Sequence, residues 1–163
     1  MRIFTAFGKK SAQSPILLGG IVLSLLALPL TASAELGGDA ASVLADQVHM
    51  KASLKTTQTD GYTVHEIQSP SGTVVREYVS SEGKVFAVAW RGPFLPDLHQ
   101  ILGASFEPFT QAARAQKTRP GHGPVVIRQA GLVILSGGHT HDFFGKAYLP
   151  ELLPQGVSAE AIQ

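Results

Sequence analysis

The sequence contains no cysteine among its 163 residues. A disulfide framework and a lipid attached to an N-terminal cysteine are therefore both excluded. Charged residues are also scarce, at 15% of the chain, and there is a single tryptophan, Trp90. Stability must come mainly from a hydrophobic core.

Motifs that carry nucleotide or nucleophile chemistry are absent as well. The chain has no nucleophile elbow, no phosphate-binding loop, no dinucleotide fingerprint and no zinc-ribbon spacing. No cofactor is therefore expected, and no spacing in the sequence identifies a reaction.

Only one long apolar run is present, Ile16 to Leu30, and its length of about 15 residues is below the roughly 20 that a spanning helix needs. Basic residues precede it, and Ala32-Ser33-Ala34 follows it as a small-residue cleavage site. This order is typical of a secretory signal peptide. We expect residues 1–34 to be removed and residues 35–163 to be exported, to the periplasm or outside the cell, with no stable membrane span.

Removal of the signal peptide changes the charge balance. Without Arg2, Lys9 and Lys10 the mature chain has 10 Lys and Arg against 12 Asp and Glu, a formal charge of −2. Nucleic-acid binding depends on a positive surface, so it is not expected. The mature chain is long enough to bury the core of one domain.

The pattern predicts an α+β fold for residues 35–163. We expect an antiparallel sheet of about five or six strands, with helices packed on one face. A meander comes first, with strands at Tyr62–Gln68, Thr73–Val79 and Lys84–Trp90. In the third strand, Val85, Ala87 and Ala89 alternate with Phe86, Val88 and Trp90, and both sets are apolar, as in an interior strand.

The register of the first hairpin is left open. A four-residue turn would place His65 opposite Arg76 and Glu66 opposite Val75, whereas a five-residue turn would place His65 opposite Val75. One residue of register changes every pairing.

Helices are predicted before and after the meander in the sequence. Residues 39–50 place Ala40, Val43, Leu44 and Val48 on one helical face, with Asp39 as the N-cap. The polar residues 51–61 predict either a frayed connection or an edge segment. After Pro96, Asp97 is expected to cap a helical region that is either kinked or made of two short helices that meet near Glu107.

The C-terminal part predicts a second hairpin and a tail. The hairpin joins Val125–Arg128 to Leu132–Ser136, and His139–Tyr148 is the last expected strand. The tail from Leu149 contains two prolines and is expected to pack across one end of the domain.

Two histidines, His139 and His141, are the candidate metal ligands. On a strand they would project from one face and share a metal ion, with Asp142 or His122 completing the set. The alternative is that they are ordinary polar histidines of a loop or strand.

The first hairpin contains a second group of polar residues. His65, Glu66, Arg76 and Glu77 are expected to form cross-strand charge pairs, with an acid–base dyad as the alternative. The edge of this hairpin, with Tyr62, His65, Arg76 and Tyr78, is the candidate binding surface, since tyrosines on a solvated sheet face make partner contacts.

Several strings resemble a known family. They are LGG from Leu36, YTVHEIQSPSGTVVREYVSSEGKVFAVAWRGPFLPDL from Tyr62, GHGP from Gly121, SGGH from Ser136 and LPELLPQGVS from Leu149. With them the mature chain resembles the exported bacterial proteins of domain of unknown function family 2844. The resemblance implies an exported bacterial protein of one domain and brings no activity, cofactor or catalytic residue with it.

We therefore expect a non-enzymatic binding or accessory module of the cell envelope; its partner is unknown, and an envelope protein is the candidate. One alternative is a metal-dependent hydrolase built on His139 and His141. Another is a periplasmic small-ligand carrier, which needs an apolar pocket.

Overall fold

The structure is a computed structural model that describes residues 35–116, 123–129 and 131–163. The predicted signal peptide, residues 1–34, lies outside the described residues, and so does His122.

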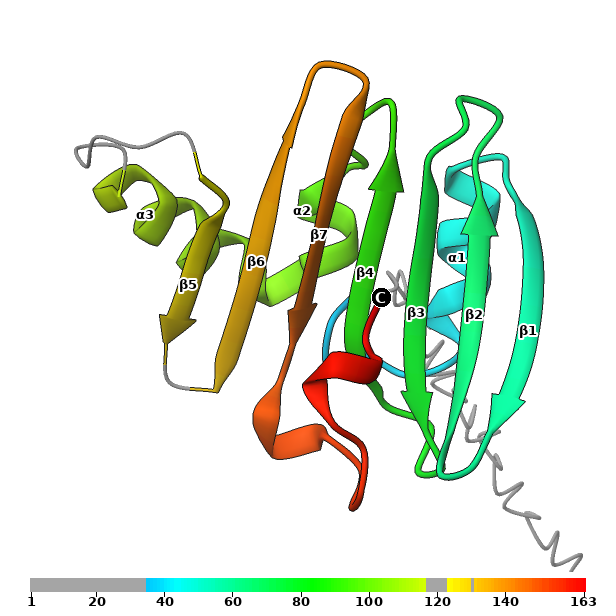
Figure 1. Cartoon of the computed structure of the whole chain (residues 1–163). Helices are drawn as coiled ribbons and strands as arrows, with labels where there is room; N and C mark the ends of the chain where they lie inside the picture. The colour runs from blue at the N-terminus through cyan, green and yellow to red at the C-terminus, as the bar shows by residue number, and fades with distance from the viewer. Residues whose placement is uncertain (1–34, 117–122, 130) are drawn as a thin grey trace, which may run out of the picture. The chain divides into compact units, whose positions relative to one another are not determined.

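Seven antiparallel strands form one sheet in the order β1-β2-β3-β4-β7-β6-β5 (Figure 1). The strands are β1 Ser53–Thr59, β2 Tyr62–Gln68, β3 Val74–Ser80, β4 Val85–Gly92, β5 Val125–Gln129, β6 Leu132–His139 and β7 Asp142–Tyr148. The α+β class and the antiparallel sheet are confirmed. The last strand, β7, pairs with both β4 and β6, so it joins the meander to the second hairpin.

The predicted number of strands was wrong, because the sheet has seven strands rather than five or six. The additional strand is β1, which forms one edge of the sheet and exposes every side chain except that of Leu54. Because neither face of β1 is deeply buried, the strand needs no apolar alternation. The edge-segment alternative for residues 51–61 was therefore the right one.

The helices lie on one side of the sheet (Figure 1). They are α1 Ser42–His49, α2 Leu98–Leu102 and α3 Phe106–Gln116, with the short 3-10 helix η1 Gly103–Ser105 between the last two. Val43, Ile101 and Leu102 pack here with one set of strand side chains in the larger core cluster. We call this side the helix face.

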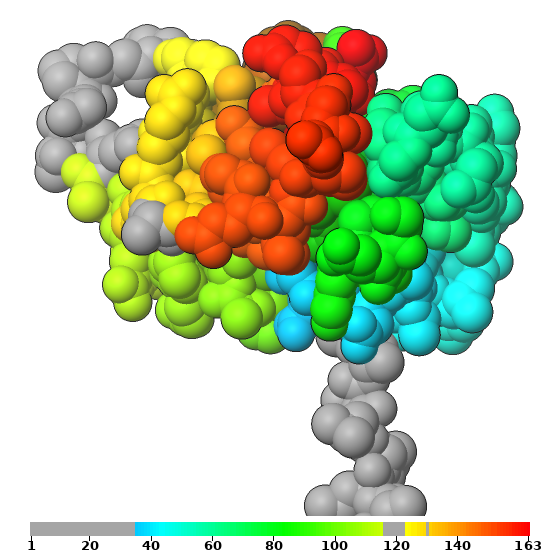
Figure 2. All heavy atoms as spheres, turned by 90° about the horizontal axis from the view of Figure 1, so that it is seen from below, coloured from blue at the N-terminus to red at the C-terminus, as the bar shows by residue number. Residues whose placement is uncertain are grey.

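The C-terminal segment, residues 149–163, lies on the opposite side of the sheet. We call this side the open face, because α1, α2 and α3 do not pack on it. Figure 2, which looks at the sheet from below, shows this red segment and the helices on opposite sides. The segment contains the 3-10 helices η2 Pro150–Leu152 and η3 Ala159–Ala161. Ile162 is 1% exposed and packs with Tyr78, Phe86, Ala87 and Ala89 in a second, smaller core cluster.

The predicted apolar face of the first helix was wrong. Leu44 and Val48 are 58% and 75% exposed, whereas Ser42, Val43 and Asp46 are buried. The helix is turned so that Asp46 faces the sheet. Asp39 is not the N-cap either, because its carboxylate instead accepts from Lys84 Nζ at 2.7 Å.

The second helical region is two helices, as predicted, but they meet earlier than expected. Asp97 Oδ1 accepts hydrogen bonds from the backbone N–H groups of His99 and Gln100, which confirms the N-cap. The break falls at Gly103, whose φ of 50° and position beside Glu35 disfavour any larger residue.

The first hairpin has the five-residue connection, residues 69–73, but the pairing predicted for it was wrong. Gln68 pairs with Val74, so that His65 lies opposite Glu77 and Glu66 lies opposite Arg76. The connection therefore includes Thr73, whose carbonyl accepts from Ser69 N–H within the loop.

Strand β4 is the buried centre of the sheet, as predicted, but its alternation is interrupted. The register against β3 shifts between Tyr78, which pairs with Ala87, and Val79, which pairs with Val85. Phe86 is the extra residue of a β-bulge. As a result Phe86, Ala87 and Ala89 pack in the open-face cluster, and Val85, Val88 and Trp90 pack in the helix-face cluster, which corrects the predicted sets.

Candidate binding groove

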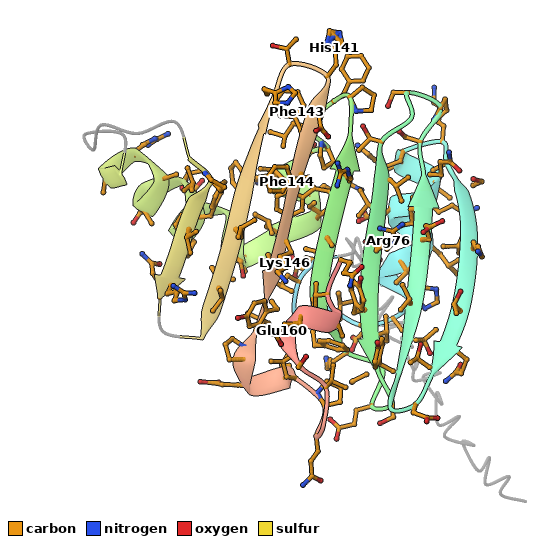
Figure 3. The ribbon with its side chains drawn as sticks, in the orientation of Figure 1. Arg76, His141, Phe143, Phe144, Lys146 and Glu160 are labelled. Atoms are coloured by element: carbon orange, nitrogen blue, oxygen red, sulfur yellow. The ribbon has the colours of Figure 1, made fainter. Side chains whose placement is uncertain are left out.

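A groove of about 420 Å³ lies on the open face beside the end of the C-terminal segment. Its walls come from β3, β4, β6, β7 and the last two residues of the chain (Figure 3). The residues that line it are Arg76, Trp90, Arg91, Leu135, Phe144, Gly145, Lys146, Ile162 and Gln163. Its volume is in the range of small-molecule sites in proteins.

The sheet register explains how residues far apart in sequence meet here. Ala89 on β4 pairs with Arg76 on one side and with Lys146 on the other, and Lys146 in turn pairs with Leu135. Directly paired residues point to the same face, so these side chains form one row across the open face.

The small side chain of Ala89 leaves room in this row for the end of the C-terminal segment. Arg76 Nη1 donates to the Gln163 carbonyl at 3.2 Å, and Lys146 Nζ donates to the carbonyls of Ala159 and Ile162 at 2.8 and 3.1 Å. The two cations therefore hold the segment from both sides, and the groove begins where the segment ends.

The floor of the groove is apolar and tightly constructed. Phe144 and Leu135 supply its side chains, and Gly145 lies between Phe144 and Lys146. A Cβ atom on Gly145 would lie 2.2 Å from Cζ2 of Trp90, so the Trp90 ring occupies the space behind this glycine. No larger residue fits there without moving the ring.

The cations of the groove differ in how they are neutralised. Arg76 Nε lies 2.8 Å from Glu66 Oε2, and Arg91 Nη2 lies 3.5 Å from Asp142 Oδ1. Lys146 Nζ instead donates to two backbone carbonyl groups and interacts at longer range with Glu160. Each of the three cations therefore has an acidic side chain in its surroundings.

A second hollow of about 170 Å³ continues along the open face. Leu135 and Lys146 line both hollows, and Val126, Arg128, Val133, Tyr148, Ala159 and Glu160 complete the second. A third cavity of about 490 Å³, beside α3, has no charged residue in its lining. Of these three hollows, the first two offer both apolar and ionic contacts.

Of the four residues of the predicted binding surface, Tyr62, Arg76 and Tyr78 lie on the open face and His65 does not. Arg76 lines the groove, but Tyr78 is only 3% exposed, and its hydroxyl bonds the backbone of Gln163. Tyr62 packs on Tyr78 and edge-on to Phe86, with ring centroids 6.0 and 5.8 Å apart. His65 is opposite Glu77, so it points to the helix face, where partial burial lowers its pKa.

The two candidate metal ligands lie at the tip of the β6–β7 hairpin and not on one strand. His139 ends β6, His141 has a left-handed φ of 67° in the turn, and β7 begins at Asp142. His139 Nε2 is 4.0 Å from Asp142 Oδ2, while the ring centroids of His141 and Phe94 are 6.4 Å apart. No group of three or more His, Cys, Asp and Glu side chains suited to a metal ion occurs within residues 35–116, 123–129 and 131–163.

A buried pair of carboxyl groups was missed in the sequence. Asp46 on α1 and Glu77 on β3 are 0% and 1% exposed, and Gln100 on α2 donates to Asp46 Oδ1. Burial raises the pKa of both, and the neighbouring Asp46 also contributes to raising that of Glu77, to about 9. The pair is sealed in the core on the helix face, away from the groove, so it has no access to a substrate.

Comparison with known proteins gives one match. The family model for "Protein of unknown function (DUF2844)" matches residues 32–162. No curated protein matches the chain, and no solved structure does. Separately, the helices of the described part of the chain all lack the length and apolar character needed to cross a membrane. The chain belongs to the DUF2844 family.

Proposed function

We propose that the protein is exported and acts as a non-enzymatic binding module of the cell envelope, with the open-face groove as its binding site. The observation that carries this proposal is the groove itself, in which an apolar floor adjoins three cations. Such a combination of apolar lining and a few polar groups is typical of ligand sites. Export is supported by the signal-peptide pattern of residues 1–34.

Binding is favoured over metal-dependent hydrolysis by the arrangement of the polar residues. His139 and His141 face different neighbours at the hairpin tip, Asp142 and Phe94. The groove contains lysine and arginine side chains but no carboxylate, histidine or hydroxyl group in its lining that would act as base or nucleophile. A small-ligand carrier is compatible with the same groove, although the hollow lies on the open face and not beneath the sheet.

Site-specific photo-crosslinking in producing cells tests the proposal. A benzophenone amino acid at position 144 places the reactive group in the groove, and the same amino acid at position 57, on β1, is the control on the same face. We expect a reproducible adduct from position 144 and none from position 57. The bound molecule, identified from the adduct and then recovered in its free form, should remain chemically unchanged on incubation with the unmodified protein.

Two results would contradict the proposal. One is the same pattern of adducts from both positions, which would mean that the groove has no selectivity. The other is turnover of the recovered molecule, which would make the protein an enzyme. Export is tested separately, because the intact mass of the native protein should correspond to a chain that begins at Glu35.

A further inference from the structure

Residues 157–163, which we call the terminal peptide, are attached to the open face differently from the strands. The backbone–backbone hydrogen bonds of residues 150–163 are local turns, from Leu152, Val157 and Ala161 to the carbonyls three residues earlier. Within the described part of the chain, no such bond joins these residues to a strand. Segments with few backbone bonds open at a lower free energy than the sheet on which they lie. Separation of the terminal peptide from the open face therefore breaks no strand pairing.

Side chains hold the terminal peptide in place instead. Ile162 is its anchor, 1% exposed in the open-face cluster. Lys146 Nζ donates to the carbonyls of Ala159 and Ile162. The Tyr78 hydroxyl accepts from the N–H of Gln163. A buried apolar anchor with bonded main-chain groups around it is the way in which many protein domains bind an extended peptide.

The groove and the terminal peptide use the same side chains. Arg76 on β3 and Lys146 on β7 line the groove, and both also donate to the terminal peptide (Figure 3). Arg76 has five N–H donors, and Glu66 and Gln163 take two of them, so three remain for another acceptor. Ile162 and Gln163 close one end of the groove. A molecule that extends along the groove therefore reaches the site of Ile162 only if the terminal peptide leaves.

The site that Ile162 fills defines the chemistry of a replacement. Its walls come from β3 and β4 and are Tyr78, Phe86, Ala87 and Ala89. The alanines leave room for a branched aliphatic side chain, which has no polar atom that would stay unpaired there. Lys146 and Tyr78 already bond main-chain groups beside it. These contacts select a peptide backbone with an apolar anchor and do not depend on the charge of the ligand.

We propose that the open face binds an extended peptide of a partner protein of the envelope, with one branched aliphatic residue in the site of Ile162. The terminal peptide is an internal copy of that partner peptide and occupies the site until the partner displaces it. The partner's main chain takes over the bonds with Arg76, Lys146 and Tyr78, and the rest of its peptide lies in the groove. This inference rests on the proposed function and names the partner class of the same site.

Fluorescence anisotropy with a dye-labelled synthetic copy of residues 157–163 tests the displacement. In the full mature chain, Ile162→Ser removes the internal anchor, and Gln163→Pro keeps the anchor but removes the N–H that bonds Tyr78. Ile162→Ser should bind the labelled peptide at least about tenfold more tightly than the wild type, whose own terminal peptide competes for the site. The affinity of Gln163→Pro should lie between the two. A labelled peptide that carries Ile162→Ser itself should give no measurable binding to either variant.

The matched control makes the same kind of change elsewhere. Val48→Ser replaces an apolar residue of α1 that is 75% exposed, so it should bind the labelled peptide as the wild type does. The thermal midpoint of each variant shows whether it is folded. If Ile162→Ser does not fold, Gln163→Pro decides the question, because it leaves every side chain of the open-face cluster in place.

The outcomes separate this inference from the function on which it rests. Equal affinity of Gln163→Pro and the wild type, no binding of the labelled peptide to the folded variants, or equal binding of the serine-containing peptide would each overturn the peptide proposal. So would a crosslink from position 144 whose mass corresponds to a small molecule or to a second copy of this chain. If position 144 still gives a specific crosslink in these cases, the groove remains a binding site for another occupant. If that crosslink is absent too, both proposals fail.

Discussion

Glu77 on β3 and Asp46 on α1 place their carboxyl groups side by side in the core of the helix face, 1% and 0% exposed. The two groups are close enough for Asp46 to contribute to raising the pKa of Glu77 to about 9. Even so, both Glu77 oxygens and Asp46 Oδ2 make no hydrogen bond of good geometry with the described residues. Glu77 is therefore held in its neutral, protonated form at pH 7.

This pair makes stability depend on pH. Between about pH 4.5, the ordinary pKa of glutamate, and about pH 9, the folded protein keeps a proton on Glu77 that the unfolded chain releases. Stability must fall as pH rises across this interval, because the folded state binds more protons. We predict a higher free energy of unfolding at pH 5 than at pH 8, measured by urea denaturation with Trp90 fluorescence.

Substitution of the buried glutamate should remove much of that dependence. Glu77→Gln keeps the shape of the side chain and cannot ionise, so it should stabilise the protein at pH 8 by about 1–3 kcal/mol, because folding at that pH no longer requires the uptake of a proton. The matched control is Glu82→Gln at the exposed β3–β4 turn, which should leave the pH dependence intact. A variant of Glu77 with the same pH slope as the wild type would contradict the assignment.

The contact between Gly145 and Trp90 predicts a sensitive position in the groove floor. Gly145→Ala puts a methyl group 2.2 Å from Trp90 Cζ2, so the indole must move within a packed core. Overpacking of this kind destabilises proteins by about 1–3 kcal/mol. Thermal unfolding followed by circular dichroism measures it, and Gly123→Ala is the control, because among the described residues nothing except its chain neighbours lies within 4 Å of a Cβ atom placed there. Equal midpoints for the two variants would be inconsistent with the packing described.

The end of the C-terminal segment is held by a tyrosine. The Tyr78 hydroxyl donates to the Gln163 carbonyl at 2.8 Å and accepts from its N–H at 2.9 Å. Tyr78→Phe should therefore speed hydrogen exchange in residues 159–163 while the rest of the sheet is unchanged. Tyr148→Phe changes another tyrosine of the open face and should have no such effect. If the two variants exchange alike, the hydroxyl does not anchor the segment.

Much of the fold was predictable from the sequence, since its strands and turns have strong local signals. Alternating or continuous apolar residues indicate the strands of both hairpins and the buried β4, and a capping residue indicates the helix start at Asp97. Strand β1 was ambiguous because an exposed edge strand needs no apolar side chains. The rotation of α1 was missed because a pattern of apolar residues does not reveal that the charged Asp46 is buried beside Glu77.

Local sequence patterns could not predict the groove. Arg76, Lys146 and Leu135 come from three strands and meet only because β7 pairs with β4 on one side and with β6 on the other. The sequence predicted strands but not their order. A one-residue error in register, as in the first hairpin, also exchanges the faces of every side chain. Thus His65 and Arg76, grouped on one predicted surface, lie on opposite faces.

The most direct test of the central claim is the photo-crosslinking comparison of positions 144 and 57 in producing cells. Position 144 lies in the groove, and position 57 lies on β1 at the far edge of the same face. If the groove is the binding site, position 144 should give a reproducible adduct and position 57 should give none. The same adducts from both positions, or no adduct from position 144, would contradict the account.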